Sequence, residues 1–408
     1  MLSQKTIDIV KSTAPVLEVK GKEITTHFYK TMFEAHPELL NIFNHANQKK
    51  GRQQTALANT VTAAAKYIDQ LEVLLPVVRQ IAHKHRSLAI KAEHYPIVGE
   101  FLLKAIKEVL GEAATDEILQ AWGEAYGAIA DIFIQVENEM YQEAEQQENG
   151  WKDFKSFRIV KKVKESEFIT SFYLEPTDGL GVPGFLPGQY VSVRLKVEGE
   201  TYLLNRQYSL SDKPNGDTYR ISVKRESEGN PAGKVSNYLH DLYEVGSEVE
   251  LSAPAGDFVL NIEEKKPVYL ISGGVGVTPM MSMLKTISAE QPNQKVTFIH
   301  SAKNGAVHAF GEEVKETIST CSNGTSYISY TSPTTKDQQA KAFDHQGYID
   351  LAFLQKVVKE TDATFYVCGP VQFMKAIIAN LEKLDIEEGN IHYEFFGPSL
   401  NLKETVMS

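Results

Sequence analysis

The sequence has little cysteine and no long apolar run. Cys321 and Cys368 are the only cysteines among 408 residues, so we expect neither a disulfide framework nor a thiolate metal cluster. The first residues lack the long apolar core of a signal peptide, and no apolar run is long enough to span a bilayer. These absences predict a protein of the reducing cytoplasm without a membrane span.

Basic residues are in the minority. The chain has 42 Lys and Arg against 53 Asp and Glu, a net charge of -11. Nucleic-acid backbones and anionic membranes select for excess positive charge, so we expect neither as the main partner. A locally basic pocket for a phosphate-bearing cofactor stays compatible with this charge. The length exceeds that of one ordinary core, and two or three domains are expected.

The first 147 residues have the pattern of an all-α domain. From Thr6 to about Gln146, apolar residues recur at helical spacing, as in the stripe Ile24, Phe28 and Met32. The dipeptides His36-Pro37 and Tyr95-Pro96 predict helix boundaries. We expect six to eight helices and no strand, followed by a polar linker over residues 142–150.

The remainder of the chain predicts two further domains. Residues 151–262 contain short β-branched and aromatic runs separated by turn residues, which is typical of a small antiparallel barrel. The expected strands cover residues 157–163, 190–195, 207–210, 219–223 and 249–251. Residues 266–408 alternate strands and helices, as in a parallel α/β sheet, with strands expected at 268–272, 296–300, 326–330 and 364–368.

The most specific motif of the barrel is Arg206-Gln207-Tyr208-Ser209, on a strand beyond the turn that leads to Tyr190. A flavin needs an aromatic wall, hydrogen bonds to its ring edge and a cation for its pyrophosphate, and Tyr, Ser and Arg supply these. Taken alone, the motif could equally be a half-exposed strand. Downstream, Gly233 and Ser236 begin a helix, and helix N-termini are natural anion sites.

A glycine loop follows the first strand of the α/β domain. It reads Gly273-Gly274-Val275-Gly276-Val277-Thr278-Pro279, and we expect a helix from Met280. Such a loop lets the backbone approach a pyrophosphate closely. The Rossmann fingerprint is absent, because Pro279 occupies the position of the third glycine. Two further motifs follow in this domain, Cys368-Gly369-Pro370 and Phe395-Phe396-Gly397-Pro398.

In the content and order of these motifs, residues 152–408 resemble the ferredoxin–NADP reductase superfamily. The resemblance implies that the barrel binds FAD, that the glycine loop binds NADH or NADPH, and that an aromatic residue near the C-terminus covers the flavin. It implies FAD-binding roles for Tyr190, Arg206, Gln207, Tyr208, Ser209, Gly233, Ser236, Phe395, Phe396, Gly397 and Pro398. It implies NAD(P)-binding roles for Gly273, Gly274, Val275, Gly276, Val277, Thr278, Cys368, Gly369 and Pro370.

The helical half contains a candidate site for a metal group that could accept electrons from the reductase without cysteine ligands. His85 lies on an apolar stripe, where a lone histidine is more often a core residue with a satisfied hydrogen bond. Glu137 also lies on an apolar stripe, and a carboxylate that faces a core needs a partner. A metal-bound imidazole with a free N–H is one such partner. Tyr29, Phe43, Gln53 and Leu57 would complete an apolar slot, although each alone suggests ordinary packing.

With these residues, the first domain resembles the globins, and the whole chain resembles the flavohaemoglobins. The resemblance implies haem b, FAD and NADH or NADPH as cofactors, dioxygen and nitric oxide as partners, and nitric oxide dioxygenase activity. It implies His85 as the proximal iron ligand, catalytic roles for Tyr29, Gln53, Tyr95 and Glu137, and a haem pocket that includes Phe43, Leu57 and Lys84. For Lys84, a solvated surface lysine is the alternative.

Other functions remain open at this stage. The helical half could be a haem-based sensor or a haem-free docking module, and the same parts could reduce hydroperoxides or oxygen. A fused reductase favours an enzyme, because a sensor needs no continuous supply of electrons. One chain contains the whole electron path, so a monomer would suffice. The sequence does not decide between NADH and NADPH.

Overall fold

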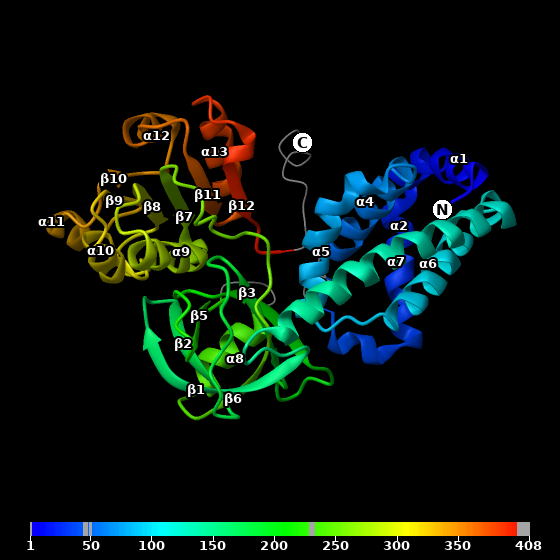
Figure 1. Ribbon diagram of the computed structural model, residues 1–408, viewed down its shortest axis with the longest axis horizontal. Helices are drawn as coiled ribbons and strands as arrows, with labels where there is room; N and C mark the ends of the chain where they lie inside the picture. The colour runs from blue at the N-terminus through cyan, green and yellow to red at the C-terminus, as the bar shows by residue number, and fades with distance from the viewer. Residues whose placement is uncertain (1, 44–47, 49–50, 228–232, 398–408) are drawn as a thin grey trace. The chain divides into compact units, whose positions relative to one another are not determined.

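The computed structural model describes residues 2–43, 48, 51–227 and 233–397 (Figure 1). The chain forms a helical domain, then a domain built on an antiparallel sheet, then one built on a parallel sheet. This order is the predicted one.

The helical domain consists of α1 (Gln4–Ser12), α2 (Ala14–Ala35), α4 (Arg52–Lys66), α5 (Leu75–Ser87), α6 (His94–Leu110) and α7 (Asp116–Gln146). Three 3-10 helices lie between them: η1 (Pro37–Asn41), η2 (Leu71–Leu74) and η3 (Gly111–Ala113). The described residues up to 146 thus form six α-helices and no strand, as predicted.

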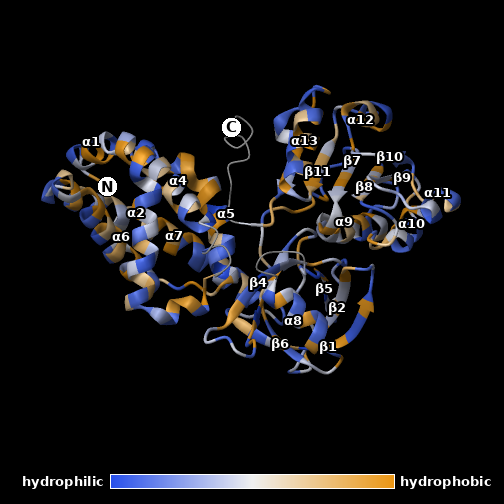
Figure 2. Ribbon diagram, turned by 180° about the vertical axis from the view of Figure 1, so that it is seen from behind, coloured by the Kyte–Doolittle hydropathy of each residue, from blue (hydrophilic) through white to orange (hydrophobic). Residues whose placement is uncertain are grey.

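Proline and amphipathic patterning explain these helices. α2 ends at Ala35, directly before His36-Pro37, because the residue that precedes a proline avoids the helical conformation. Pro96 lies in the first turn of α6, where its missing N–H removes no helical hydrogen bond. The helices carry hydrophobic and hydrophilic stretches side by side (Figure 2), and the stripe Ile24, Phe28 and Met32 is almost fully buried.

The antiparallel domain has six strands: β1 (Phe154–Lys164), β2 (Ile169–Pro176), β3 (Tyr190–Leu195), β4 (Leu204–Ser209), β5 (Tyr219–Lys224) and β6 (Glu248–Ser252). Helix α8 (Lys234–Leu242) lies between β5 and β6 in the chain. The strand order is β4-β3-β6-β1-β2-β5, and a bridge between Leu210 and Ile221 joins the two end strands. The sheet therefore closes on itself as the predicted barrel.

Three strands of this domain differ from the prediction. β1 begins at Phe154, three residues before its predicted start. β2 was not predicted, because its residues are buried at nearly every position and lack the alternation of a half-exposed strand. β4 begins at Leu204, three residues before the predicted start, so the whole motif from Arg206 to Ser209 lies within it.

The parallel domain is a sheet of order β10-β9-β8-β7-β11-β12 in which every pair is parallel. Its strands are β7 (Val268–Gly273), β8 (Val296–Ala302), β9 (Gly324–Tyr330), β10 (His345–Gln346), β11 (Thr364–Cys368) and β12 (Ile391–Glu394). Its helices are α9 (Val277–Glu290), α10 (Gly311–Ser319), α11 (Thr335–Ala340), α12 (Leu351–Val357) and α13 (Val371–Glu382), with 3-10 helices η4 (Gly274–Gly276) and η5 (Glu388–Asn390).

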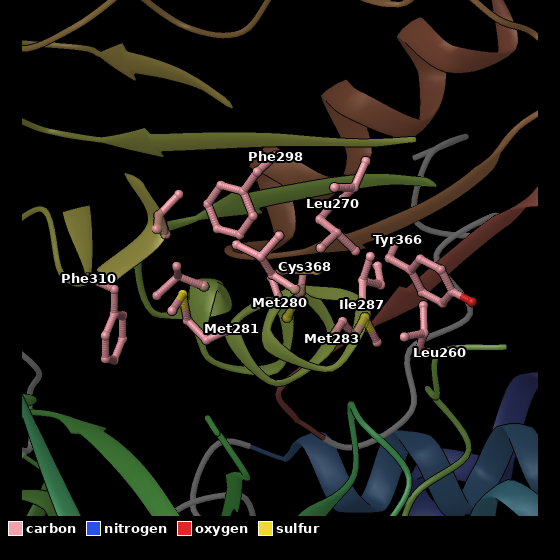
Figure 3. Close-up of a cluster of buried hydrophobic side chains, with 14 of the residues drawn as sticks. Leu260, Leu270, Met280, Met281, Met283, Ile287, Phe298, Phe310, Tyr366 and Cys368 are labelled. Carbon is pink, nitrogen blue, oxygen red and sulfur yellow. The ribbon is translucent and has the colours of Figure 1, made fainter. Parts of the chain in front are cut away.

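Helices cover both faces of this sheet. Leu270 of β7 and Phe298 of β8 pack against Met280 of α9 on one face, as Figure 3 shows. The neighbouring side chains Tyr269 and Ile271 point to the other face, into a core shared with α12 and α13. β7, β8 and β11 are buried at every position, and buried parallel strands are largely apolar in sequence.

α7 ends at Gln146 and β1 begins at Phe154, so the first domain boundary that we propose, between residues 147 and 151, falls between them. The second, between residues 262 and 266, falls between β6 and β7. Among the described residues, no helix is long and apolar enough to cross a membrane.

Candidate functional site

Three helices bring His85, Tyr95 and Glu137 together. Nδ1 of His85 lies 2.7 Å from a carboxylate oxygen of Glu137 and 3.2 Å from the hydroxyl of Tyr95. The Tyr95 hydroxyl donates to the same carboxylate oxygen at 2.6 Å. Both contacts of the imidazole use Nδ1, so Nε2 is the nitrogen that the arrangement leaves for a metal.

The carboxylate in this network is deeply buried. The side chain of Glu137 is 3% exposed, and a buried carboxylate is stable only if hydrogen bonds compensate it. Burial, together with the neighbouring charge of Glu137, raises the pKa of Tyr95 far above its ordinary value, so the phenol keeps its proton and acts as a donor. Tyr126 supports Tyr95, because its hydroxyl donates to the Tyr95 carbonyl at 2.6 Å.

An apolar cavity adjoins His85. Its lining comes from α4, η2, α5 and α7: Thr60, Ala63, Ala64, Leu71, Leu74, Val77, Val78, Ile81, Ile129, Ile132 and Phe133. Ile81 lies one turn before His85 on α5, and the Phe133 ring lies 5.8 Å from the imidazole. Among the described residues, no group of three or more His, Cys, Asp or Glu could hold a bare ion. One imidazole beside an apolar cavity fits a porphyrin-held iron instead.

Tyr29 of α2 supplies a buried phenol. Its ring contacts the rings of Phe28, Phe33 and Phe43 at centroid distances of 4.8, 5.7 and 5.8 Å. Burial raises its pKa well above the ordinary value, so the hydroxyl is a neutral donor. In the part of the chain that the structure describes, this hydroxyl has no hydrogen-bond partner, and it is available to a ligand.

The side chain of Gln53 has an orienting partner that sequence reasoning missed. Nε2 of Gln48 donates to Oε1 of Gln53 at 2.9 Å, and Nε2 of Gln54 donates in turn to Oε1 of Gln48 at 2.9 Å. The carbonyl end of Gln53 is thereby occupied, and its amide N–H groups are left to donate. Leu57 lies one turn further along α4 and packs against the helical core. Lys84 is half-buried in the last turn of α5, next to His85.

The residues predicted to bind flavin lie on β3 and β4. Tyr190 begins β3 and is 8% exposed, with its backbone paired to Ala255. Arg206, Gln207 and Tyr208 follow one another on β4 and are half-buried or exposed, while Ser209 is buried. This part of the strand therefore offers accessible polar and aromatic side chains.

Gly233 precedes α8 and Ser236 lies in its first turn, as predicted. The Ser236 hydroxyl accepts a hydrogen bond from the Glu226 backbone at 3.3 Å and donates to the Gly233 carbonyl. A Cβ on Gly233 would lie 2.6 Å from that hydroxyl, so only glycine fits this start of the helix.

The glycine loop is shorter than predicted. Gly273 ends β7, residues 274–276 form η4, and α9 begins at Val277 rather than at Met280. The predicted helix start was wrong because a proline fits inside the first turn of a helix, and Pro279 lies in the first turn of α9. Val277 and Thr278 thus belong to the N-terminal turn, whose backbone N–H groups can bind a phosphate.

Close packing explains the glycines of this loop. A Cβ on Gly276 would lie 2.3 Å from the carbonyl oxygen of Cys368 and 2.6 Å from the nitrogen of Gly369. The loop after β7 and the segment after β11, including Pro370 at the start of α13, therefore touch through their backbones. Parallel strands β7 and β11 are neighbours, so both segments lie at the carboxyl edge of the sheet, where such folds bind nucleotides.

The thiol of Cys368 is fully buried. Burial, and then the nearby charge of Glu394, raises its pKa well above the ordinary value, so the thiol stays neutral. It packs in the core beside α9 (Figure 3).

The two C-terminal phenylalanines differ in exposure. Phe395 packs against the sheet core, whereas Phe396 is 43% exposed, so Phe396 is the ring that could cover a flavin. Gly397 is half-buried, and Pro398 lies outside the described residues.

Comparison with known protein families divides the chain in the same way. The Globin family model matches residues 26–133, the Oxidoreductase FAD-binding domain matches residues 156–260, and the Oxidoreductase NAD-binding domain matches residues 270–378. The fold and these matches define an oxidoreductase that joins a haem protein to a flavin reductase.

Similar proteins extend over the full chain. A flavohemoprotein of Bacillus cereus is 60% identical over 99% of this chain and 100% of its own length, and one of Bacillus subtilis is 52% identical over 100% of both. A solved flavohemoglobin from Malassezia yamatoensis with bound FAD and heme has a TM-score of 0.86 at 29% identity, over 97% of this chain and 100% of that one.

The chain therefore belongs to the flavohemoprotein family, the flavohaemoglobins. Its cofactors are haem, FAD and a nicotinamide dinucleotide. The reductase half alone is similar to the FAD/NAD-binding domain of a nitric oxide dioxygenase from Vibrio cholerae, with a TM-score of 0.55 at 39% identity over 60% of this chain and 99% of that one.

Proposed function

We propose that this protein is a nitric oxide dioxygenase, which uses electrons from NADH or NADPH to convert nitric oxide and dioxygen to nitrate. The observation that carries the proposal is the network of His85, Tyr95 and Glu137 beside an apolar cavity, fused to a complete reductase. When bound, FAD accepts the hydride of the nicotinamide and releases single electrons, and haem supplies the iron at which the two gases combine.

On the distal side, we assign Tyr29 and Gln53 to ligand binding. The Tyr29 hydroxyl is a neutral donor in a dry pocket, and a hydrogen bond strengthens when the accepting ligand gains negative charge. The amide of Gln53 assists, because Gln48 occupies its carbonyl end. We assign Leu57 and Phe43 to the apolar wall of the gas-binding pocket.

On the proximal side, we assign His85 as the iron ligand through Nε2. The Glu137 carboxylate accepts a charge-assisted hydrogen bond from Nδ1–H of His85. This bond makes the imidazole more electron-rich and fixes its orientation. Tyr95 holds the carboxylate in place. An imidazole held in this electron-rich state would favour oxygen activation over reversible oxygen carriage once haem is bound. Lys84 would border this side of the haem pocket.

In the reductase half, we assign Tyr190 and the β4 motif from Arg206 to Ser209 to FAD, together with the α8 start at Gly233 and Ser236. Arg206 would pair with the pyrophosphate, and Tyr208 would pack on the flavin ring. The C-terminal segment from Phe395 to Pro398 would cover the flavin.

The dinucleotide would bind at the carboxyl edge of the parallel sheet. The backbone from Gly273 to Thr278 would hold the pyrophosphate, and the segment from Cys368 to Pro370 would border the nicotinamide. One chain contains every proposed site of the electron path from the dinucleotide to the haem, so a monomer suffices for the reaction. Both cysteines are buried thiols, as suits a reducing cytoplasm, where we place the protein.

The test is nitric oxide consumption by the purified holoprotein in aerated buffer, followed with an electrode, with NADH and then NADPH as donor. We expect rapid loss of nitric oxide and equal formation of nitrate, with no loss when either oxygen or the dinucleotide is omitted. If both cofactors are bound but nitric oxide persists, the proposal fails, and peroxides become the next substrates to assay. NADH turnover that needs oxygen but not nitric oxide would point to a simple oxidase.

A further inference from the structure

Four charged side chains form one cluster where the FAD barrel meets the parallel domain. Nη1 of Arg220 (β5) donates to both carboxylate oxygens of Glu313 (α10), at 3.0 and 2.9 Å. Nζ of Lys285 (α9) pairs with Asp212 at 2.5 Å and with Glu313 at 2.8 Å. Asp212 also lies 3.9 Å from Nε of Arg220. We call these four residues the clasp.

The clasp is electrically balanced and largely buried. It contains two cations and two carboxylates, with side-chain exposures of 2% for Arg220, 16% for Asp212, 22% for Lys285 and 26% for Glu313. Removing one member would leave a poorly solvated charge without its partner, which is more costly than breaking an exposed pair. The clasp contacts therefore hold the barrel and the parallel domain in place more firmly than surface ion pairs would.

Aromatic rings enclose the guanidinium of Arg220. Phe310 lies 5.1 Å and Tyr173 lies 5.8 Å from it, measured to the ring centroids. Phe310 precedes α10 in the left-handed conformation, with φ of 64°, which is strained for a bulky side chain. Its ring is 3% exposed and belongs to the α9 core (Figure 3). The start of α10 is thus held in a strained geometry beside the clasp.

An apolar contact runs beside the clasp. Ile169, Phe258 and Leu260 of the barrel half belong to the same buried cluster as α9 (Figure 3 shows Leu260). Apolar packing brings surfaces together without fixing their register closely, because it is not directional. Hydrogen-bonded charge pairs are directional, so the clasp can fix the register of this contact.

The clasp connects the two segments that we assign to the reacting cofactors. Asp212 lies three residues after Ser209, the end of the predicted flavin motif on β4. Lys285 lies on α9, whose first turn contains Val277 and Thr278 of the predicted dinucleotide loop. The pair between these residues joins the bend that follows the flavin strand to the dinucleotide helix.

We propose that the clasp is a positioning device that sets the distance between the nicotinamide and the flavin. This inference rests on the proposed cofactor assignments of the reductase half. In the step concerned, a C–H bond of the nicotinamide breaks, its hydrogen and electron pair pass to the flavin, and a proton from water completes the reduced flavin. The rate of such a transfer depends steeply on placement, and an error of about 1 Å can cost about a hundredfold.

The test compares the double variant Lys285→Met with Asp212→Asn against a matched control. The double variant removes one cation and one carboxylate, so the Arg220–Glu313 pair stays balanced. The control is Arg158→Met with Glu248→Gln, an ion pair of 3.4 Å on the same barrel whose side chains are 53% and 54% exposed. Holoprotein is mixed anaerobically with NADH or its 4-deuterated form, and flavin reduction is followed by stopped flow.

We expect the limiting rate of flavin reduction in the clasp variant to fall at least tenfold, with a deuterium isotope effect as large as in the wild type or larger. The long-wavelength charge-transfer absorbance of the nicotinamide–flavin complex should weaken, while FAD content and NADH affinity stay within twofold. The control should match the wild type. A Lys285→Arg variant should keep most of the rate, because it keeps the charge and donors.

A limiting rate and charge-transfer absorbance within twofold of the wild type in the clasp variant would overturn the proposal. A fall explained entirely by lost FAD would also overturn it, because it would show a role in stability alone. If the double variant does not fold, Asp212→Glu provides the comparison, because it keeps every charge of the clasp and displaces one carboxylate. No nitric oxide is present in this assay, so its failure would leave the proposed gas reaction untouched, and failure of that reaction would leave this assay valid.

Discussion

Replacing Glu137 with glutamine tests the proximal network most sharply. Glutamine has nearly the same shape and can still accept from Nδ1 of His85, so the 2.7 Å contact can persist without its charge. Hydrogen bonds to charged groups contribute about 1.5–3 kcal/mol and neutral ones about 0.5–1.5 kcal/mol. The variant should therefore lose about 1 kcal/mol of interaction, which is roughly 40 mV for one electron.

The sign of the effect follows from the charge. A carboxylate on the imidazole stabilises oxidised iron more than reduced iron, so its neutralisation should raise the reduction potential of the haem. Spectroelectrochemical titration of the holoprotein measures this shift, and Glu139→Gln, an exposed change on the same helix, is the control. A potential within about 10 mV of the wild type would refute the reasoning, because the buried carboxylate would then have no influence on the iron.

Four further predictions follow from the site and the fold. Tyr29→Phe should raise the dissociation rate of oxygen by roughly tenfold to a hundredfold, which corresponds to the loss of one charge-assisted hydrogen bond. An unchanged rate in flash photolysis would show that Tyr29 does not donate to the bound oxygen. Gln48→Leu should raise the oxygen dissociation rate by about fivefold, since Gln53 loses its orienting donor, and should shift the stretching frequency of bound carbon monoxide. If the rate and the frequency both stay unchanged, Gln48 does not orient Gln53. His85→Ala should give haem-poor protein that keeps its flavin and reduces artificial acceptors, and full haem retention in the absorption spectrum would place the axial ligand elsewhere. Burial lowers the pKa of His308 from 6.5 to about 4, so the unfolded chain binds more protons than the folded chain between these pH values. The free energy of unfolding should therefore fall as the pH drops through this window, by about 3 kcal/mol at pH 4. Chemical denaturation of His308→Asn should show a smaller loss of stability than the wild type, and an equal loss would contradict the burial argument.

The fold could be predicted where one physical signal dominated. Helical spacing and prolines located the helices of the first domain, and continuous apolar runs located β7, β8 and β11. β2 escaped prediction because Thr170, Ser171 and Glu175 interrupt its apolar residues, so it has neither an alternating pattern nor a continuous apolar run. The start of α9 was misplaced because a proline inside a first turn looks the same in sequence as one before a helix.

The site could be predicted in part. His85 and Glu137 were noticed because each is polar on an apolar stripe, and the structure brings them to 2.7 Å. The roles of Gln48 and Arg220 could not be found in this way. Gln48 lies before α4, so the spacing of that helix does not relate it to Gln53, and Arg220 meets Glu313 across 93 residues. The only sequence signal for Arg220 was a charged residue near the start of a predicted strand.

The most direct test of the central claim is the ratio of nitrate formed to NADH consumed when the holoprotein removes nitric oxide in air. Oxidising nitric oxide to nitrate releases three electrons and reducing dioxygen takes four, so each turnover draws one further electron from the reductase. We predict two nitrates for each NADH, with both atoms of labelled dioxygen recovered in the nitrate. NADH consumption that continues at the same rate without nitric oxide, or nitrate without labelled oxygen, would contradict the account.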